Sequence, residues 1–119
     1  MIYHITFPEA WRVALQRGEY RAESLETEGF IHCSTRSQIL PVAEKFFQGR
    51  GTLLLLMMDP ARLASEMKWE TPSGGGPPPG VPEGDMFPHV YGPINLDAVV
   101  NVFDLEANPD GKHILPVLD

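Results

Sequence analysis

Hydrophobic and polar residues alternate with a period of two at the start of the chain. Within residues 1–6, Ile2, His4 and Thr6 fall on one face, while Tyr3 and Ile5 fall on the other. A period of two is typical of a β-strand with one face toward a core. The opening segment is therefore predicted to be a strand.

The pattern then changes to a helical period over residues 8–17. Pro8 suits the first turn of a helix, and Gly18 is a natural residue for its end. The apolar positions that form one stripe for core packing are Ala10, Trp11, Ala14 and Leu15.

A single helical turn over residues 24–28 is expected to lead into a second strand over residues 29–34. In that strand Phe30, His32 and Ser34 share one face, and Cys33 points to the other. Cys33 is accordingly predicted to pack in the core.

A second long helix is predicted over residues 36–48. Thr35 and Gln38 have the spacing of a capping box, and Pro41 is expected to kink or delay the helix because its ring removes a hydrogen bond. Its predicted buried side consists of Ile39, Leu40, Val42, Ala43, Phe46 and Phe47.

Residues 52–58 are almost entirely apolar, which predicts a strand covered on both faces. Asp59 and Pro60 then suit the cap and first position of a short helix reaching Ser65. Another short strand is expected over residues 67–70.

The segment 71–84 is dense in glycine and proline and is predicted to be an exposed loop. Two interpretations stay open: a surface insertion without a role, or a mobile loop over a functional site.

The last part of the chain contains extended segments and turns. Residues 87–93 are predicted to be extended, Asn95 to cap one helical turn, and residues 99–105 to form a strand. The turn chemistry of residues 108–111 predicts that residues 113–117 pair back as a hairpin.

Helices and strands do not alternate regularly, so the fold class is predicted to be α+β, in a single domain spanning residues 1–119. The hydrophobic share of 43% and the charged share of 21% are typical of globular domains.

A net charge of −7 argues against nucleic acid as a partner. The single cysteine excludes an intrachain disulfide. With no apolar run of membrane-spanning length and no signal-peptide pattern, we expect a cytoplasmic protein.

The residues with most chemical potential are His4, His32 and His89, each on an extended segment between apolar neighbours. Buried polar groups need partners or a function. We therefore predict that these imidazoles meet in one solvent-reachable cleft. The alternative is that each is a hydrogen-bonded core residue.

The chain resembles the bacterial family known as domain of unknown function 952. The resemblance covers residues 1 to about 102 and is most specific in Gly29-Phe30-Ile31-His32-Cys33-Ser34 and Phe87-Pro88-His89-Val90-Tyr91-Gly92. It implies an ADP-ribosyltransferase-like fold: a split, mostly antiparallel β-core with helices packed around it. Fold alone implies little about activity.

The resemblance also implies roles by position. His4 on the first strand would hold the ribose of an NAD-like ligand, and Glu70 would supply the catalytic carboxylate. Tyr91 or Phe30 would stack on the ligand's ring. RNA 2′-phosphotransferases of the same fold suggest phosphate contacts for Arg12 and Arg36. The catalytic candidates are thus His4, His32 and Glu70, and the ligand-binding candidates are Ser34, Arg36, His89, Tyr91, Phe30 and Arg12.

Three functional hypotheses follow. The first is binding of a nucleotide-like small molecule, NAD-like or phosphorylated, with transferase or hydrolase chemistry on it. The second is a non-enzymatic small-ligand binding module. The third is a metal site built from histidine and glutamate, since imidazole and carboxylate suit zinc or iron.

Overall fold

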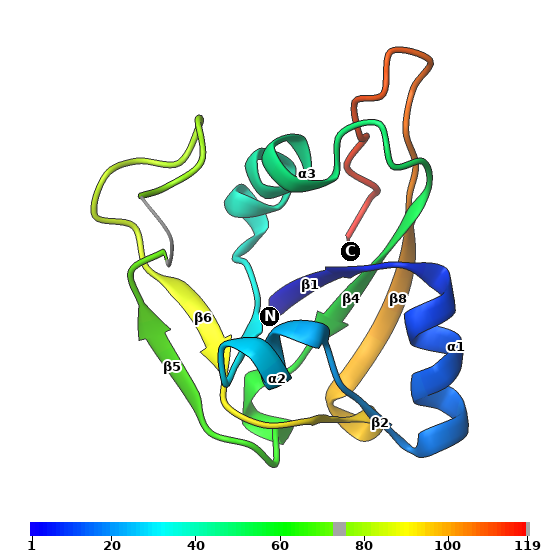
Figure 1. Ribbon diagram of the computed structural model, residues 1–119, viewed down its shortest axis with the longest axis vertical. Helices are drawn as coiled ribbons and strands as arrows, with labels where there is room; N and C mark the ends of the chain where they lie inside the picture. The colour runs from blue at the N-terminus through cyan, green and yellow to red at the C-terminus, as the bar shows by residue number, and fades with distance from the viewer. Residues whose placement is uncertain (73–75, 119) are drawn as a thin grey trace.

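The computed structural model describes residues 1–72 and 76–118, which form helices around antiparallel sheets (Figure 1). The helices are α1 (Pro8–Arg17), α2 (Glu23–Thr27) and α3 (Ile39–Phe47), with three 3₁₀ turns at Arg36–Gln38, Pro60–Arg62 and Leu96–Ala98. The strands are β1 (Ile2–Thr6), β2 (Glu19–Tyr20), β3 (Ile31–His32), β4 (Leu53–Met58), β5 (Met67–Glu70), β6 (Phe87–Val90), β7 (Ile94–Asn95) and β8 (Val99–Leu105). The prediction of an α+β class is confirmed.

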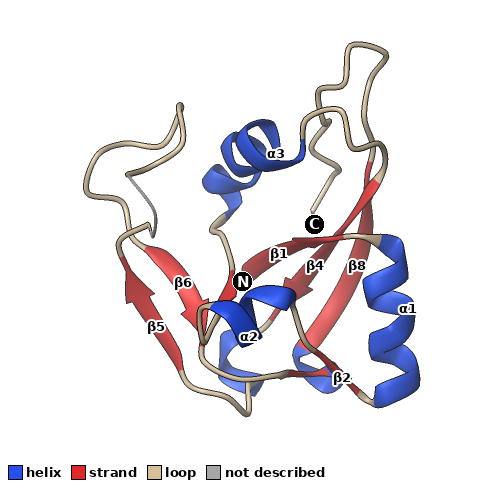
Figure 2. Cartoon of the chain, in the orientation of Figure 1, coloured by secondary structure: helices blue, strands red, loops and turns tan. Residues whose placement is uncertain are grey.

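The central sheet has the strand order β1-β4-β8, and both pairings are antiparallel. Its middle strand β4 is apolar throughout because each face is covered, as residues 52–58 predicted. One face packs against α3 and the C-terminal segment, and the other packs against α1 and α2 (Figure 2). The alternation of β1 is confirmed: Ile2 lies in one core cluster, while Tyr3 and Ile5 lie in the other.

A second antiparallel sheet has the order β3-β6-β5, and β2 pairs separately with β7. The two three-stranded sheets are joined by one antiparallel bridge between Tyr3 and Ser34. Both backbone hydrogen bonds of this bridge are present, at 2.9 and 2.7 Å. Beyond the bridge, β5 and β6 lie apart from β1, β4 and β8 (Figure 1), and residues of β1 and β6 line the cleft described below.

The strand predicted over residues 29–34 is much shorter than expected. Only Ile31 and His32 pair with β6. The backbone then changes partners, because Cys33 still donates to Pro88 of β6 while Ser34 pairs with Tyr3 of β1. A segment that crosses between two sheets cannot form a long ladder with either, so the predicted strand length was wrong. The predicted faces are confirmed, with Ile31 and Cys33 in the core and His32 and Ser34 at the cleft.

Helix α1 has the predicted bounds, and Gly18 ends it with a φ of 88°. Leu15 was predicted to pack in the core but is exposed. The buried position of this helix is Ala14, whose small side chain allows α1 to lie close to the sheet.

The long helix begins later than predicted, since Arg36–Gln38 form a 3₁₀ turn before α3. The Thr35 N–H donates to the Gln38 side-chain oxygen at 2.9 Å, which is the expected half of a capping box. Pro41 therefore falls in the first turn of α3, where its missing N–H is not needed. Two predicted core positions, Leu40 and Phe46, are exposed.

The predicted C-terminal hairpin forms only next to its turn and does not extend to residue 117. Residues 108–111 do form a turn, in which Gly111 has a φ of 87°. The chain pairs back through a bridge between Ala107 and His113, and the Ile114 N–H donates to the Glu106 carbonyl at 2.8 Å. The segment then runs beside α3 as irregular chain (Figure 1) and inserts Leu118 into the core. The helix predicted to reach Ser65 is a 3₁₀ turn that ends at Arg62.

Residues 71–72 and 76–84 are irregular as predicted, and the rest of this predicted loop, residues 73–75, lies outside the described part of the chain. Pro78 and Val81 are buried, so this loop packs against the body of the protein. Within residues 1–72 and 76–118, no helix has the length and apolar character needed to cross a membrane.

Candidate functional site

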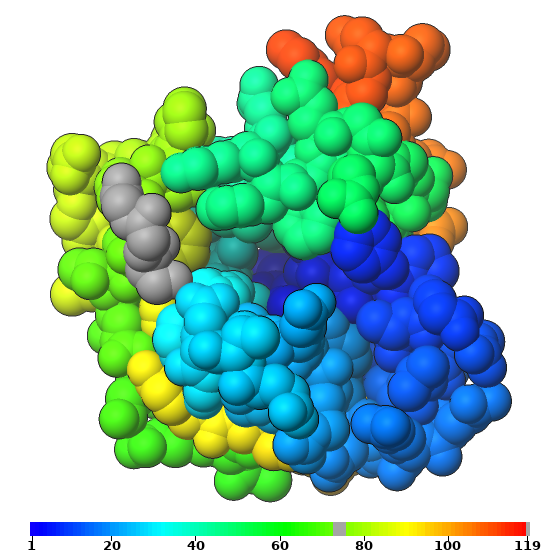
Figure 3. Space-filling view, in the orientation of Figure 1, coloured from blue at the N-terminus to red at the C-terminus, as the bar shows by residue number. Residues whose placement is uncertain are grey.

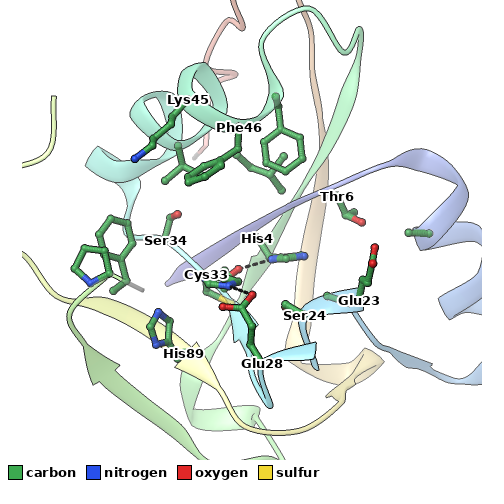
Figure 4. Close-up of a pocket in the computed structure, with 18 of the residues that line it drawn as sticks. His4, Thr6, Glu23, Ser24, Glu28, Cys33, Ser34, Lys45, Phe46 and His89 are labelled. Atoms are coloured by element: carbon green, nitrogen blue, oxygen red, sulfur yellow. Dashed lines mark hydrogen bonds and ion pairs between the residues drawn. The ribbon is translucent and has the colours of Figure 1, made fainter. Parts of the chain in front are cut away.

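A cleft of about 720 Å³ opens between α3 and α2, with β1 as its floor. Figure 3 shows this hollow from outside, and Figure 4 shows the side chains that line it. The walls come from both sheets, because residues 32–34 and β6 also contribute to them. The volume lies within the range that binds small molecules in proteins.

His4 lies on the floor of the cleft, and both of its ring nitrogens are hydrogen-bonded. Nδ1 donates to the His32 carbonyl oxygen at 2.5 Å, and Nε2 lies 2.8 Å from the Tyr20 hydroxyl. Because a carbonyl can only accept, Nδ1 holds the ring proton and Nε2 accepts from Tyr20. The Tyr20 oxygen then accepts from the Thr6 hydroxyl at 2.8 Å.

Burial lowers the pKa of His4 to about 4, although the bond to the His32 carbonyl opposes this shift. Burial also raises the pKa of Tyr20 to about 12. Both groups are therefore neutral near pH 7. The network positions the floor and holds the backbone of His32 against β1.

His32 extends from β3 with a partly exposed side chain. Its Nε2 lies 2.9 Å from Oε2 of Glu28, at the end of α2. A carboxylate can only accept, so this contact places a proton on Nε2. Glu28 also lines the cleft (Figure 4).

His89 forms a second pair with a carboxylate, on the neighbouring strand. It is 3% exposed, and its Nδ1 lies 2.9 Å from Oε1 of Glu70 on β5. The Tyr91 hydroxyl donates to the same oxygen at 2.5 Å. The bonds from Tyr91 and His89 lower the pKa of Glu70, so this side chain is a carboxylate at neutral pH. The same contact raises the pKa of Tyr91.

Phe30 packs between these two pairs. It stacks on His89 with ring centroids 4.2 Å apart and 22° between the planes, and it meets His32 edge-on at 4.8 Å. The Tyr91 ring also contacts Phe30, with the centroids 5.3 Å apart and the planes tilted by 42°. The contacts hold His32 and His89 together, with their centroids 5.5 Å apart.

Helix α3 supplies the opposite wall. Phe46 is 58% exposed, and the Lys45 ammonium lies 5.4 Å from the centre of its ring. Pro78 of the glycine- and proline-rich loop and Phe87 of β6 add apolar surface. The loop thus forms part of the cleft, which favours the functional interpretation of residues 71–84 for its described residues.

Ser34 lines the cleft from the bridge that joins the two sheets. Cys33 lies in the core as predicted and touches the cleft as well. Burial raises the pKa of the Cys33 thiol, so it is not a thiolate near pH 7.

The predicted site residues divide into three groups. His4, His32, Ser34 and His89 line the cleft together. Glu70 and Phe30 do not line the cleft but contact His89, and Tyr91 contacts Glu70 and Phe30 in turn. The two arginines lie elsewhere, because Arg12 pairs with Glu9 on the exposed side of α1 and Arg36 is exposed in the 3₁₀ turn.

The sequence analysis missed Tyr20, Glu28, Lys45 and the exposed Phe46 as cleft residues. Glu28 had a usable signal, since it precedes His32 by four residues at the end of a helical turn. Phe46 had none, because an aromatic residue at helical spacing is expected to be buried.

Metal ligation receives no support from the geometry. Among the residues that the structure describes, no group of three or more His, Cys, Asp or Glu side chains is placed to hold a metal ion.

Comparison with solved structures finds one protein in several forms. The crystal structure of protein CC0527 from Caulobacter crescentus has a TM-score of 0.81 and 31% identity, over 96% of this chain and 93% of that one. The crystal structure of a CC0527 variant with two methionine substitutions has a TM-score of 0.80 and 30% identity, over 96% of this chain and 93% of that one. The solution NMR structure of CC0527 has a TM-score of 0.74 and 31% identity, over 93% of this chain and 89% of that one.

No curated protein matches the chain. Residues 5–102 match a family described as protein of unknown function (DUF952), which agrees with the resemblance seen in the sequence. The chain therefore belongs to the DUF952 family.

Proposed function

We propose that the cleft binds a nucleotide-like small molecule. The observation that carries the proposal is the contrast between its two sides. An exposed aromatic ring and a lysine lie on α3, and hydrogen-bonding groups lie on the floor and on the second sheet.

Each part of a nucleotide has a matching surface. A planar base can stack on Phe46, which needs no reorganisation because its ring is already exposed. A phosphate can pair with the ammonium of Lys45, which precedes Phe46 in α3. The ribose hydroxyls can hydrogen-bond to His32 and Ser34 across the cleft.

An ADP-ribosyltransferase-like fold and an NAD-like ligand belong to this proposal. The two antiparallel sheets that diverge from the Tyr3–Ser34 bridge support it. A ribose contact from His4 does not follow from the geometry, since both ring nitrogens are already bonded within the protein. His32 is the better candidate for that contact.

A panel of AMP, ADP and NAD tests the proposal by thermal shift and by titration calorimetry. We expect at least one of these ligands to raise Tm, because a ligand that binds only the folded state stabilises it. Lys45→Ala is expected to weaken binding of the phosphorylated ligands, and Phe46→Ala to weaken binding of all of them.

Lys112→Ala is the matched control, since Lys112 is exposed in the turn after β8 and does not line the cleft. This variant should bind as the wild type does. If no ligand of the panel changes Tm or gives heat on titration, the proposed function is wrong. Equal weakening by the variants at 45 and 112 would show that binding occurs elsewhere.

The alternative is a binding module without catalysis. It shares the cleft and the ligand class, and it differs only in what the histidines do.

A cytoplasmic location also belongs to the proposal, because a lone buried cysteine is typical of reducing compartments. Cell fractionation would test the location.

A further inference from the structure

The two histidine–carboxylate pairs at the cleft have matching chemistry. His32 is bonded to Glu28 and His89 to Glu70, each with 2.9 Å between nitrogen and oxygen. In each pair the carboxylate fixes the ring and determines which nitrogen holds the proton. The second nitrogen, Nδ1 of His32 or Nε2 of His89, is the one that can exchange a proton with a ligand.

The two rings are close enough to act on one small group. Their centroids are 5.5 Å apart and their planes are at 76°, so the rings do not stack on each other. Both residues line the same cleft. Because the two rings are in edge contact with each other, a ligand reaches both of them from the cleft and not from between them.

The surroundings of the two rings differ in a way that suits opposite roles. The His32 side chain is 44% exposed, so it can exchange protons with solvent. His89 is 3% exposed and lies between the Glu70 carboxylate and the face of Phe30. As a general acid His89 needs a proton on each ring nitrogen, one for the Glu70 carboxylate and one for the ligand.

We infer that His32 and His89 form a general base and general acid pair that hydrolyses a nucleotide phosphodiester bound in the cleft. This inference rests on the proposed function, since it takes the nucleotide site as given. The singly charged phosphodiester is suited to the cleft because Lys45 can pair with it there, whereas Arg21, which also lines the cleft, is already paired with Glu19.

The proposed reaction is balanced with water as the only co-reactant. His32 takes a proton from water as the water oxygen forms a bond to phosphorus. The bond between phosphorus and the leaving oxygen breaks, and His89 gives its proton to that oxygen. The products are a phosphomonoester and an alcohol. Proton exchange with solvent then returns both histidines to their starting forms.

Cleavage of a glycosidic bond is less well supported. It needs a carboxylate beside the reacting carbon to stabilise an oxocarbenium-like transition state. Glu70 does not line the cleft, and the Oε2 atom of Glu28 is bonded to His32. Each carboxylate instead accepts a hydrogen bond from a histidine ring, and we assign Glu28 and Glu70 as positioning residues.

Incubation of the full chain with 2′,3′-cyclic AMP, followed by ³¹P NMR, tests the inference. We expect the cyclic phosphodiester signal to be replaced by that of a phosphomonoester, with a bell-shaped dependence of kcat on pH. His32→Asn should lower kcat by roughly 10² to 10⁴ and remove the acid limb. His89→Asn should lower it similarly and remove the alkaline limb. The limbs differ because a base must be deprotonated and an acid protonated.

His113→Asn is the matched control, since its imidazole bonds to the Gly51 carbonyl outside the cleft. This variant should keep the full rate and the full bell. Circular dichroism checks that each variant folds. If His89→Asn does not fold, Glu70→Gln replaces it, because the amide fills the same space without the charge. This variant should also reduce the decrease of kcat on the alkaline side of the pH profile.

Binding of AMP by the same variants separates the two proposals. Binding without turnover of the cyclic nucleotide would overturn the acid–base inference and leave the proposed function standing. Absence of AMP binding by the wild type would overturn both. Turnover that His32→Asn and His89→Asn leave unchanged would also overturn the inference, since another group would then carry the protons.

Discussion

At the scale of single residues, His4 has the largest resolved departure from ordinary histidine chemistry. It is buried on the floor of the cleft, and burial lowers its pKa from 6.5 to about 4. The sequence marked His4 as a candidate, and the alternation in β1 correctly placed it opposite Tyr3. It could not show that Tyr20, sixteen residues later, would occupy its second nitrogen. That contact depends on where α1 and β2 return the chain.

The lowered pKa predicts how stability changes with acidity. Unfolded His4 binds a proton below pH 6.5, whereas folded His4 does so only below about pH 4. Stability should therefore fall as pH decreases through this window, and none of this loss is present above pH 7. The loss should be about 2 kcal/mol by pH 5 and on the order of 3 kcal/mol below pH 4.

Urea unfolding at pH 7.5 and pH 5 measures this difference. His4→Asn removes the titrating group, so its stability should fall less between these pH values than that of the wild type. His113→Asn serves as the control and should follow the wild type. An identical decrease for His4→Asn and wild type would contradict the assignment.

At the scale of elements, local signals identified strands and helices better than their ends. Helix α1 and strand β8 have the predicted bounds, because Pro8, Gly18 and an apolar run define them locally. The short ladders β2 and β7 escaped prediction, since a two-residue pairing leaves no periodic pattern. The strand predicted over residues 29–34 was too long because the hydrogen bonds of this segment change partner between the two sheets. No local sequence pattern predicts that change.

The turn between β6 and β7 contains a close contact that only glycine permits. A Cβ atom on Gly92 would lie 2.4 Å from Oγ of Ser65 and 2.9 Å from its Cβ. The Ser65 hydroxyl donates to the Pro93 carbonyl at 2.7 Å, which holds this side chain in place. Gly92→Ala should therefore lower the free energy of unfolding by about 1–3 kcal/mol.

A double-mutant cycle measured by urea unfolding tests the cause. Ser65→Gly removes the atoms that clash, so the alanine at 92 should cost less in the Ser65→Gly background. Gly84→Ala is the control, since its Cβ meets nothing within 4 Å. Its cost should be the same in both backgrounds. Strictly additive effects of the changes at 65 and 92 would show that the clash is not the reason.

At the scale of the whole molecule, the cleft exists because two antiparallel sheets meet at one bridge and then diverge. The sequence predicted that distant histidines would converge, and three of them do line one cleft. It could not predict the α3 wall, because Phe46 looks like a core residue until the helix is placed. It also assigned residues 113–117 to a hairpin, whereas the pairing ends at Ile114 and the chain then runs beside α3 into the core.

That return of the chain closes the core on the α3 side of the central sheet. Leu118 is 4% exposed and packs in the same cluster as Leu53 and Leu105. The neighbouring Val117 is 79% exposed. Leu118→Ala should therefore lower the free energy of unfolding by about 2–5 kcal/mol, through lost burial and the cavity left behind.

Val117→Ala provides a matched control one residue away and should change the free energy of unfolding by less than about 0.5 kcal/mol. Urea denaturation of both variants gives the comparison. Because this core cluster supports α3 from below, Leu118→Ala should also weaken nucleotide binding through Lys45 and Phe46. Equal stabilities for the two variants would show that the C-terminal segment does not contribute to the core, and the α3 wall would then be held by the sheet alone.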